Sequence, residues 1–183
     1  SARIGATART YRSLLADPTF VALLLMGGLV FASIFAYVSG ASFVLQEGFG
    51  LSERAFGLVF GANALGLTLL SQLNPLLIRR FSQVDVLTGA LVVSVLAAAG
   101  LVVAGASGTG GLVMVLVPLF VVLGAAGLAI PNTPSLALSR HGEAAGTASA
   151  LLGCTQFAIG AAVAPLVGLT GSTTTVPMGA VML

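Results

Sequence analysis

Apolar residues run almost unbroken through five long stretches of the chain, and polar residues gather between them. A helix that rises about 1.5 Å per residue needs about 20 apolar residues to cross a hydrocarbon core of about 30 Å. Each stretch reaches that length, so the pattern predicts five membrane-spanning helices. They cover about residues 20–46, 55–78, 86–106, 112–138 and 147–169.

A sixth apolar stretch covers residues 178–183 and is too short to cross a bilayer. The chain also begins with Ser1 rather than with methionine. We therefore expect a piece of a longer all-α polytopic membrane protein, with five full spans and a truncated sixth.

Composition supports a membrane location and excludes several other classes. Hydrophobic residues make up 57% of the chain and charged residues only 7%, whereas a soluble domain carries about 25% charged residues. Every basic side chain is an arginine, and the arginines form no basic cluster of the kind that nucleic-acid binding requires.

Arginine is distributed unequally between the two sides that the five spans define. One side has Arg3, Arg9, Arg12, Arg79, Arg80 and Arg140, and the other side has Arg54 alone. Cytoplasmic loops carry the excess of positive charge, so we expect the N-terminus to be cytoplasmic. His141 shares a cytoplasmic loop with Arg140, and we expect it to face solvent there.

The chain lacks the residue groupings of an enzyme or a metal site. Nucleophilic catalysis needs a Ser or Cys beside a base, but His141 lies in a loop while Cys154 lies inside a span. We therefore predict no enzymatic activity, no cofactor and no metal, and interpret Cys154 as a small core residue.

Small residues and prolines give expectations for individual spans. Gly and Ala let membrane helices approach closely. Two such stripes, Gly57, Gly61, Ala64 and Thr68 on the second span and Gly146, Gly153, Gly160 and Ala164 on the fifth, predict tight packing. Pro131 and Pro134 predict a kink or helix end near Ile130, with Asn132 bonding the freed backbone groups. The third span contains only Thr88 and Ser94 as polar residues, so it should lie at the lipid-facing rim.

Two blocks of sequence resemble a known transporter family. They are "YVSGASFVLQEGFGLSERAFGLVFGANALGLTLLSQLNPLLIRRF" (37–81) and "PNTPSLALSRHGEAAGTASALLGCTQFAIGAAVAPLVGL" (131–169). Both are similar to the C-terminal half of a major facilitator superfamily drug:proton antiporter of the bicyclomycin and chloramphenicol resistance branch. The resemblance implies spans seven to eleven with a truncated twelfth, a missing N-terminal half, and export of small drugs in exchange for protons across a bacterial inner membrane.

The chain departs from the family at one loop motif, of the form G-x-x-x-D-R-x-G-R-R. Asn74 stands at the first glycine and Ile78 at the acid, so a charge-locked gate is not expected here and Arg79 and Arg80 should anchor the loop. All five acids lie at span ends or in loops. A proton-carrying carboxylate, which is typically buried in the membrane, is therefore expected in the missing half.

The candidate substrate site follows from helical periodicity. At about 100° per residue, one face of the first span gathers two aromatic and three polar side chains within about 80°: Phe31, Phe35, Ser39, Ser42 and Gln46. The second span carries a similar face: Phe56, Phe60, Asn63, Ser71 and Asn74. Gln156 and Phe157 of the fifth span could join them. Facing stripes of this kind resemble a drug pocket, which is mostly apolar with a few polar groups.

Alternatives remain for the site and for the function. The polar residues could instead mark the outer membrane interface while the phenylalanines face lipid. Tyr37 lies about 160° from the first stripe and should pack elsewhere. An importer of a nutrient or metabolite is the alternative function, and a membrane subunit that transports nothing is more distant. Import of a charged or sugar substrate would favour charged residues or several amides at mid-span.

Overall fold

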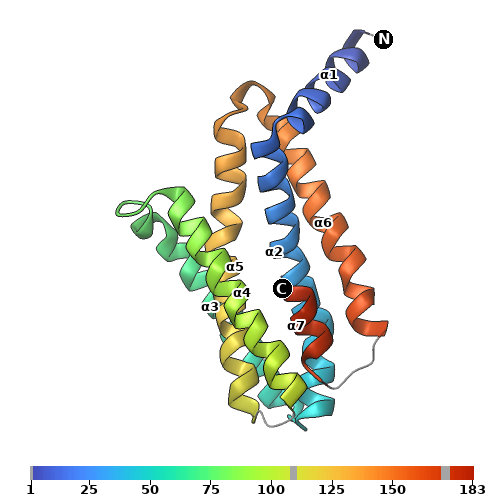
Figure 1. Cartoon of the computed structure of the whole chain (residues 1–183), viewed down its shortest axis with the longest axis vertical. Coiled ribbons are helices and arrows are strands. Elements are labelled where there is room, and N and C mark those ends of the chain that lie inside the picture. Colours follow the sequence, from blue (N-terminus) through green and yellow to red (C-terminus); the bar gives the residue numbers. More distant parts are fainter. Residues whose placement is uncertain (1, 108–110, 170–173) are drawn as a thin grey trace.

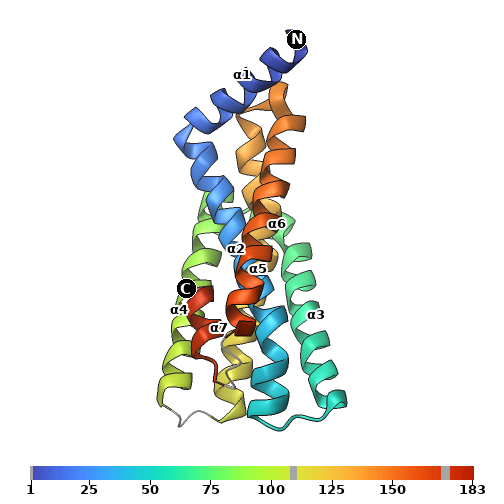
Figure 2. The same cartoon turned by 90° about the vertical axis from the view of Figure 1, so that its right-hand side faces the viewer.

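Five long helices run side by side along the longest axis of the computed structural model, which describes residues 2–107, 111–169 and 174–183 (Figures 1 and 2). Helix α1 lies obliquely at one end. The described elements are α1 (Ala2–Ala16), α2 (Pro18–Ser42), the π-helical turn η1 (Phe43–Gly48), α3 (Glu53–Leu77), α4 (Gln83–Ser107), α5 (Leu112–Ser139), the 3₁₀ turn η2 (Gly142–Ala144), α6 (Ala145–Leu169) and α7 (Val176–Met182).

The predicted spans are confirmed. Within the described part of the chain, five segments are long and apolar enough to cross a membrane, and each overlaps one predicted run. They are Pro18–Gly48, Glu53–Leu77, Gln83–Ser107, Leu112–Ser139 and Gly142–Gly168. Helix α7 corresponds to the short sixth stretch. The segments between the third and fourth predicted spans and between the fifth span and the short sixth stretch fall partly outside the described residues.

Helix α1 was not predicted, and a short cap joins it to α2. Asp17 adopts an extended backbone conformation and its Oδ1 accepts a hydrogen bond from the Thr19 backbone N–H at 2.9 Å. Pro18, which lacks a backbone donor, occupies the first turn of α2, where that donor has no helical partner. Leu14 of α1 is fully buried in the same apolar cluster as Phe20 of α2. The cap therefore turns α1 so that its last turn covers the start of α2.

Helix α5 is the centre of one group of helices, because it packs against α3, α4 and α2. Glycines allow its close approach to α3. Gly127 lies directly against the Leu67 backbone carbonyl, and a Cβ added at Gly124 would lie 2.8 Å from Leu70 Cδ1. From the other side, a Cβ at Gly66 would lie 2.5 Å from the Phe120 ring. Larger residues at these positions would push the two helices apart.

Helices α2 and α6 form the second close pair. Gly28 of α2 lies directly against the Ile159 side chain of α6, and a Cβ at Gly160 of α6 would lie 2.7 Å from the Phe35 ring. The predicted tight packing of the fifth-span stripe is thus confirmed at Gly160. It is wrong at Gly146 and Gly153, which have no neighbour within 4 Å of an added Cβ.

The second-span stripe also differs from the prediction. Gly57 and Gly61 meet nothing within 4 Å, and Ala64 and Thr68 are exposed. The reason is that α3 turns its Asn63 and Gly66 face toward the bundle, leaving the small-residue face outside. Cys154, expected in the core, is likewise exposed on α6.

Helix α4 lies at the edge of the bundle, where it packs against α5 and the short α7 (Figure 2). The large apolar side chains exposed along it are Val84, Val92, Val93, Val95, Leu96 and Val103. This placement agrees with the expected lipid-facing rim.

A kink or a helix end was expected near Ile130. The helix end is wrong, because α5 continues through Pro131 and Pro134 to Ser139, and the kink stays a prediction. Packing of α5 against its neighbours outweighs the local cost of the two prolines. Asn132 does bond the backbone of that turn, since its Nδ2 donates to the Leu128 carbonyl at 2.7 Å.

Substitution of Gly127 tests whether close approach of α3 and α5 holds the fold. The Cβ of Gly127→Ala would overlap the Leu67 carbonyl oxygen. We expect a loss of about 1–3 kcal/mol of stability, typical of overpacking, seen as a lower melting temperature in detergent. Gly89→Ala on α4 is the control, because its added Cβ meets nothing within 4 Å. Equal melting temperatures for the two variants would contradict this packing account.

Candidate functional site

Three phenylalanines from two helices form an aromatic wall, the name used below for Phe31, Phe35 and Phe157. The Phe157 ring of α6 meets the Phe31 ring of α2 edge-on, with centroids 5.4 Å apart, and the Phe35 ring at 6.4 Å. Phe157 is 60% exposed, so the wall has an open side. Phe157 therefore meets two predicted site residues of α2 that lie far from it in the sequence.

Gln156 places an amide beside this wall. Gly27 of α2 leaves room for it, because an added Cβ there would lie 2.8 Å from Gln156 Nε2 and 3.3 Å from Thr133 Cγ2 of α5. Gln156 therefore reaches the junction of α2, α5 and α6 one turn of α2 before Phe31.

The polar part of the predicted stripe continues along α2 toward η1. Ser39, Ser42 and Gln46 are all half-buried. Gln46 Nε2 donates a hydrogen bond to Ser42 Oγ at 3.3 Å, which places these two side chains on one face across the start of the π-helical turn. The stripe thus runs from two aromatic residues to two hydroxyls and an amide.

Phe60 and Asn63 do not face the aromatic wall, so the two predicted stripes do not face each other. Asn63 is buried and its Nδ2 donates to the Tyr37 hydroxyl at 2.9 Å, while the Phe60 ring stacks on the Tyr37 ring at 5.3 Å. Tyr37 lies on the opposite side of α2 from the wall, so α3 meets the back of α2. The sequence predicted that Tyr37 packs away from the stripe, but it did not predict that Asn63 and Phe60 are its partners.

Asn74, also placed on the predicted second-span face, bonds to α5 instead. Asn132 Nδ2 donates to Asn74 Oδ1 at 2.6 Å, and Asn74 Nδ2 donates to Asn132 Oδ1 at 3.4 Å. Both side chains are buried. The pair ties α3 to α5 and offers no open surface to a ligand.

A polar cluster at the α1 end of the bundle corrects the expectation for His141. Its Nε2 lies 2.9 Å from Asp17 Oδ2, and its ring meets the Phe20 ring edge-on at 5.4 Å. Arg140 donates to Thr19 Oγ1 at 3.3 Å. His141 is therefore a partly buried link between the α5–α6 turn and the start of α2. No local sequence signal marks a contact across 124 positions.

Several groups act on the carboxyl of Asp17. Partial burial acts to raise its pKa, but hydrogen bonds from the Thr19 backbone, His141 and the Phe20 backbone, with the charge of Arg140, outweigh burial. The pKa of Asp17 consequently lies below its ordinary value of 3.8.

The wall and its polar neighbours can bind but offer no reactive group. The wall is apolar, and the neighbouring groups are an amide and hydroxyls, which fix orientation by hydrogen bonding. In residues 2–107, 111–169 and 174–183, no three His, Cys, Asp or Glu side chains gather as metal ligands would.

Comparisons with known proteins identify relatives of this chain. A profile described as Major Facilitator Superfamily matches residues 2–165. An uncharacterized MFS-type transporter of Bacillus subtilis (strain 168), YdgK, is 36% identical over an alignment of 183 positions that covers 98% of this chain. The chain spans 44% of the length of that relative. No solved structure gives a significant match.

The hydrogen bond between Tyr37 and Asn63 predicts a measurable coupling. Tyr37→Phe leaves the buried Asn63 amide without its acceptor and should lower stability by about 0.6 kcal/mol, up to about 1.7, as for other hydrogen bonds between membrane helices. In an Asn63→Leu background the same change should cost much less. Unfolding in mixed micelles would measure this double-mutant cycle, and strictly additive losses would exclude the bond.

The lowered pKa of Asp17 predicts a pH dependence of stability. The carboxylate stabilises the fold above the ordinary pKa of 3.8, and that contribution is lost as the pH falls through the lower folded value. Asp17→Asn keeps a capping oxygen but loses the charge. We expect it to lower the melting temperature at neutral pH and to match the unmodified chain only once the pH lies below the lowered pKa of the folded state.

Glu143→Gln is the control for this measurement, because Glu143 is an exposed acid in the same turn as His141. A difference between Asp17→Asn and the unmodified chain that stays constant down to strong acid would contradict the role of the charge.

Proposed function

The chain belongs to the major facilitator superfamily, and on that premise we propose that it forms the C-terminal half of a drug efflux transporter. This half rocks against an N-terminal half in alternating access and exports small amphipathic drugs in exchange for protons. The observation that carries the proposal is the aromatic wall, open on one side, with the Gln156 amide beside it.

The chemistry of the wall favours drugs over charged or sugar substrates. Aromatic faces bind flat apolar groups, and a few polar side chains fix their orientation. Ser39, Ser42 and Gln46 extend the wall and supply such groups without a charge. We assign Phe60 and Asn63 a supporting role, in which they hold the back of α2 through Tyr37.

The exposed small-residue face of α3 supports a partner half. Gly57 and Gly61 have no neighbour, although glycine at such spacing typically brings two membrane helices together. The curated relative is more than twice as long as the matched region. We propose that a helix of the N-terminal half packs on this face, and that α7 begins the last span.

Proton coupling is assigned to the N-terminal half. The acids of this chain lie at the ends of spans or between them: Asp17, Glu47, Glu53, Asp85 and Glu143. A carboxylate that carries protons across a membrane is normally held inside the bundle.

We place the protein in a bacterial inner membrane with the N-terminal end of this chain in the cytoplasm. Six of its seven arginines then lie on the cytoplasmic side.

Truncation of the wall tests the transport proposal in the intact transporter. Phe35→Ala removes one aromatic contact of about 0.5–1.5 kcal/mol, so drug affinity should fall about two- to tenfold and the resistance profile should change. Leu96→Ala, at an exposed site on α4, is the control for loss of apolar surface. Unchanged profiles with normal membrane expression would exclude the wall as the site. Growth that depends on uptake of a nutrient would favour the importer.

Labelling of single cysteines tests the orientation. After Cys154→Ala, a cysteine at Ser82 should react only with permeant reagents, and one at Glu53 should also react with impermeant reagents added outside. Both positions are exposed in loops or at helix ends. The reverse pattern would overturn the assigned topology.

A further inference from the structure

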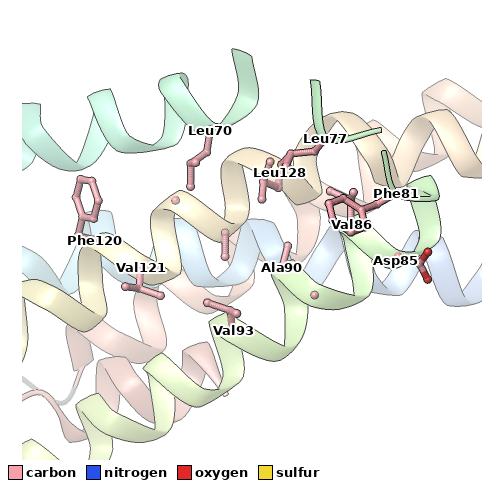
Figure 3. Close-up of a pocket in the computed structure, with 13 residues that line it drawn as sticks. Leu70, Leu77, Phe81, Asp85, Val86, Ala90, Val93, Phe120, Val121 and Leu128 are labelled. Carbon is pink, nitrogen blue, oxygen red and sulfur yellow. The ribbon is translucent and has the colours of Figure 1, made fainter. Parts of the chain in front are cut away.

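A cavity of about 380 Å³ lies between α3 and α4, with α5 as its floor (Figure 3). Its walls include Leu70 and Leu77 of α3, Val86 and Val93 of α4, and Phe120 and Leu128 of α5. Figure 3 shows Phe81, Val86 and Asp85 at one end and Phe120 at the other. Of the residues that line it, only Asp85 is charged, so the groove suits a long apolar group with a polar end.

This groove opens toward lipid rather than toward the proposed partner half. On the helical wheel of α3, Leu70 and Leu77 lie about 150° or more from the small-residue face of Gly57 and Gly61. The exposed leucines that lie between these two faces are Leu58, Leu65, Leu69, Leu73 and Leu76. A half that packs on the glycines therefore leaves the groove uncovered, and in this respect the inference rests on the proposed function.

The dimensions match one leaflet. From Asp85 to Val93 the groove follows α4 over eight helical steps, about 12 Å at about 1.5 Å per residue. Half of a hydrocarbon core of about 30 Å is about 15 Å. One acyl chain with its headgroup near Asp85 therefore fits along it.

The charges at the Asp85 end favour an anionic headgroup. Arg79 and Arg80 are exposed and stand in sequence between Leu77 and Phe81, which both line the groove. Asp85 is engaged in a helix cap, where its Oδ2 accepts from the Ser82 N–H at 3.3 Å and its own N–H donates to Ser82 Oγ at 3.1 Å. Two exposed guanidinium groups against one capping carboxylate give this end of the groove a net positive charge.

We propose that this groove is a binding site for an anionic glycerophospholipid of the cytoplasmic leaflet. One acyl chain lies between α3 and α4, and the phosphate contacts Arg79 and Arg80. Basic residues at cytoplasmic helix ends attract anionic lipid. The sequence analysis assigned Arg79 and Arg80 only the anchoring of a cytoplasmic loop. The proposal adds that they bind the lipid phosphate.

Native mass spectrometry of the full chain tests the site. The protein is purified in mild detergent and equilibrated with equal amounts of phosphatidylglycerol and phosphatidylethanolamine. We expect preferential retention of phosphatidylglycerol, which falls about fivefold for each arginine replaced in Arg79→Gln and Arg80→Gln. Arg54→Gln, at the start of α3, should leave retention unchanged.

A second pair of variants tests the groove itself. Val93→Phe fills it, whereas Val92→Phe places the same side chain outside it, and the two valines are similarly exposed at 47% and 52%. Lipid retention should fall for Val93→Phe alone. Equal retention by these two variants, preference for phosphatidylethanolamine, or no effect of the arginine substitutions would each overturn the proposal. None of these measurements requires drug transport. A failure of the lipid proposal can therefore be told apart from a failure of the efflux proposal.

Discussion

Close contact at glycines holds this bundle together, because apolar side chains gain little free energy by leaving lipid for an interface between helices. Gly127 brings the α5 backbone against the Leu67 carbonyl, and Gly28 and Gly160 bring α2 and α6 together. Inside the membrane no hydrophobic effect drives the helices together, so the dispersion contacts and hydrogen bonds between them stabilise the fold. The fold thus consists of an α2–α6 pair and an α3–α5–α4 group, joined where α2 packs on α5.

Helix α3 shows most clearly what this constraint allows. It is held by glycine contacts to α5 and by two hydrogen-bonded pairs, Tyr37 with Asn63 and Asn74 with Asn132. These contacts use one side of the helix and leave two faces free. One free face is small and suited to another helix, and the other is rich in leucine and suited to lipid. The two polar pairs thus fix the rotation of α3 about its own axis. That rotation decides which face of α3 is turned toward α5 and which faces stay open.

The sequence predicted the spans well, because the length of an apolar run is set by bilayer thickness and not by tertiary contacts. Helical periodicity also grouped Phe31 with Phe35 and separated Tyr37 from them. It did not show which helices are neighbours, so the meeting of Phe35 with Phe157 and of Tyr37 with Asn63 required the structure. The helix end expected near Ile130 failed because neighbouring helices hold α5 together through its prolines. His141 lacked any local signal for its contact with Asp17.

The contact between Asp17 and His141 also bears on motion. It joins the start of α2 to the turn that leads into α6, and the glycine contacts join the same two helices along their length. Both carry the aromatic wall. A rocking half would therefore move the wall as one rigid unit, with its rings kept in mutual contact. In the proposed transporter, access to the wall would then change at the interface with the proposed partner half and not by rearrangement of the wall itself.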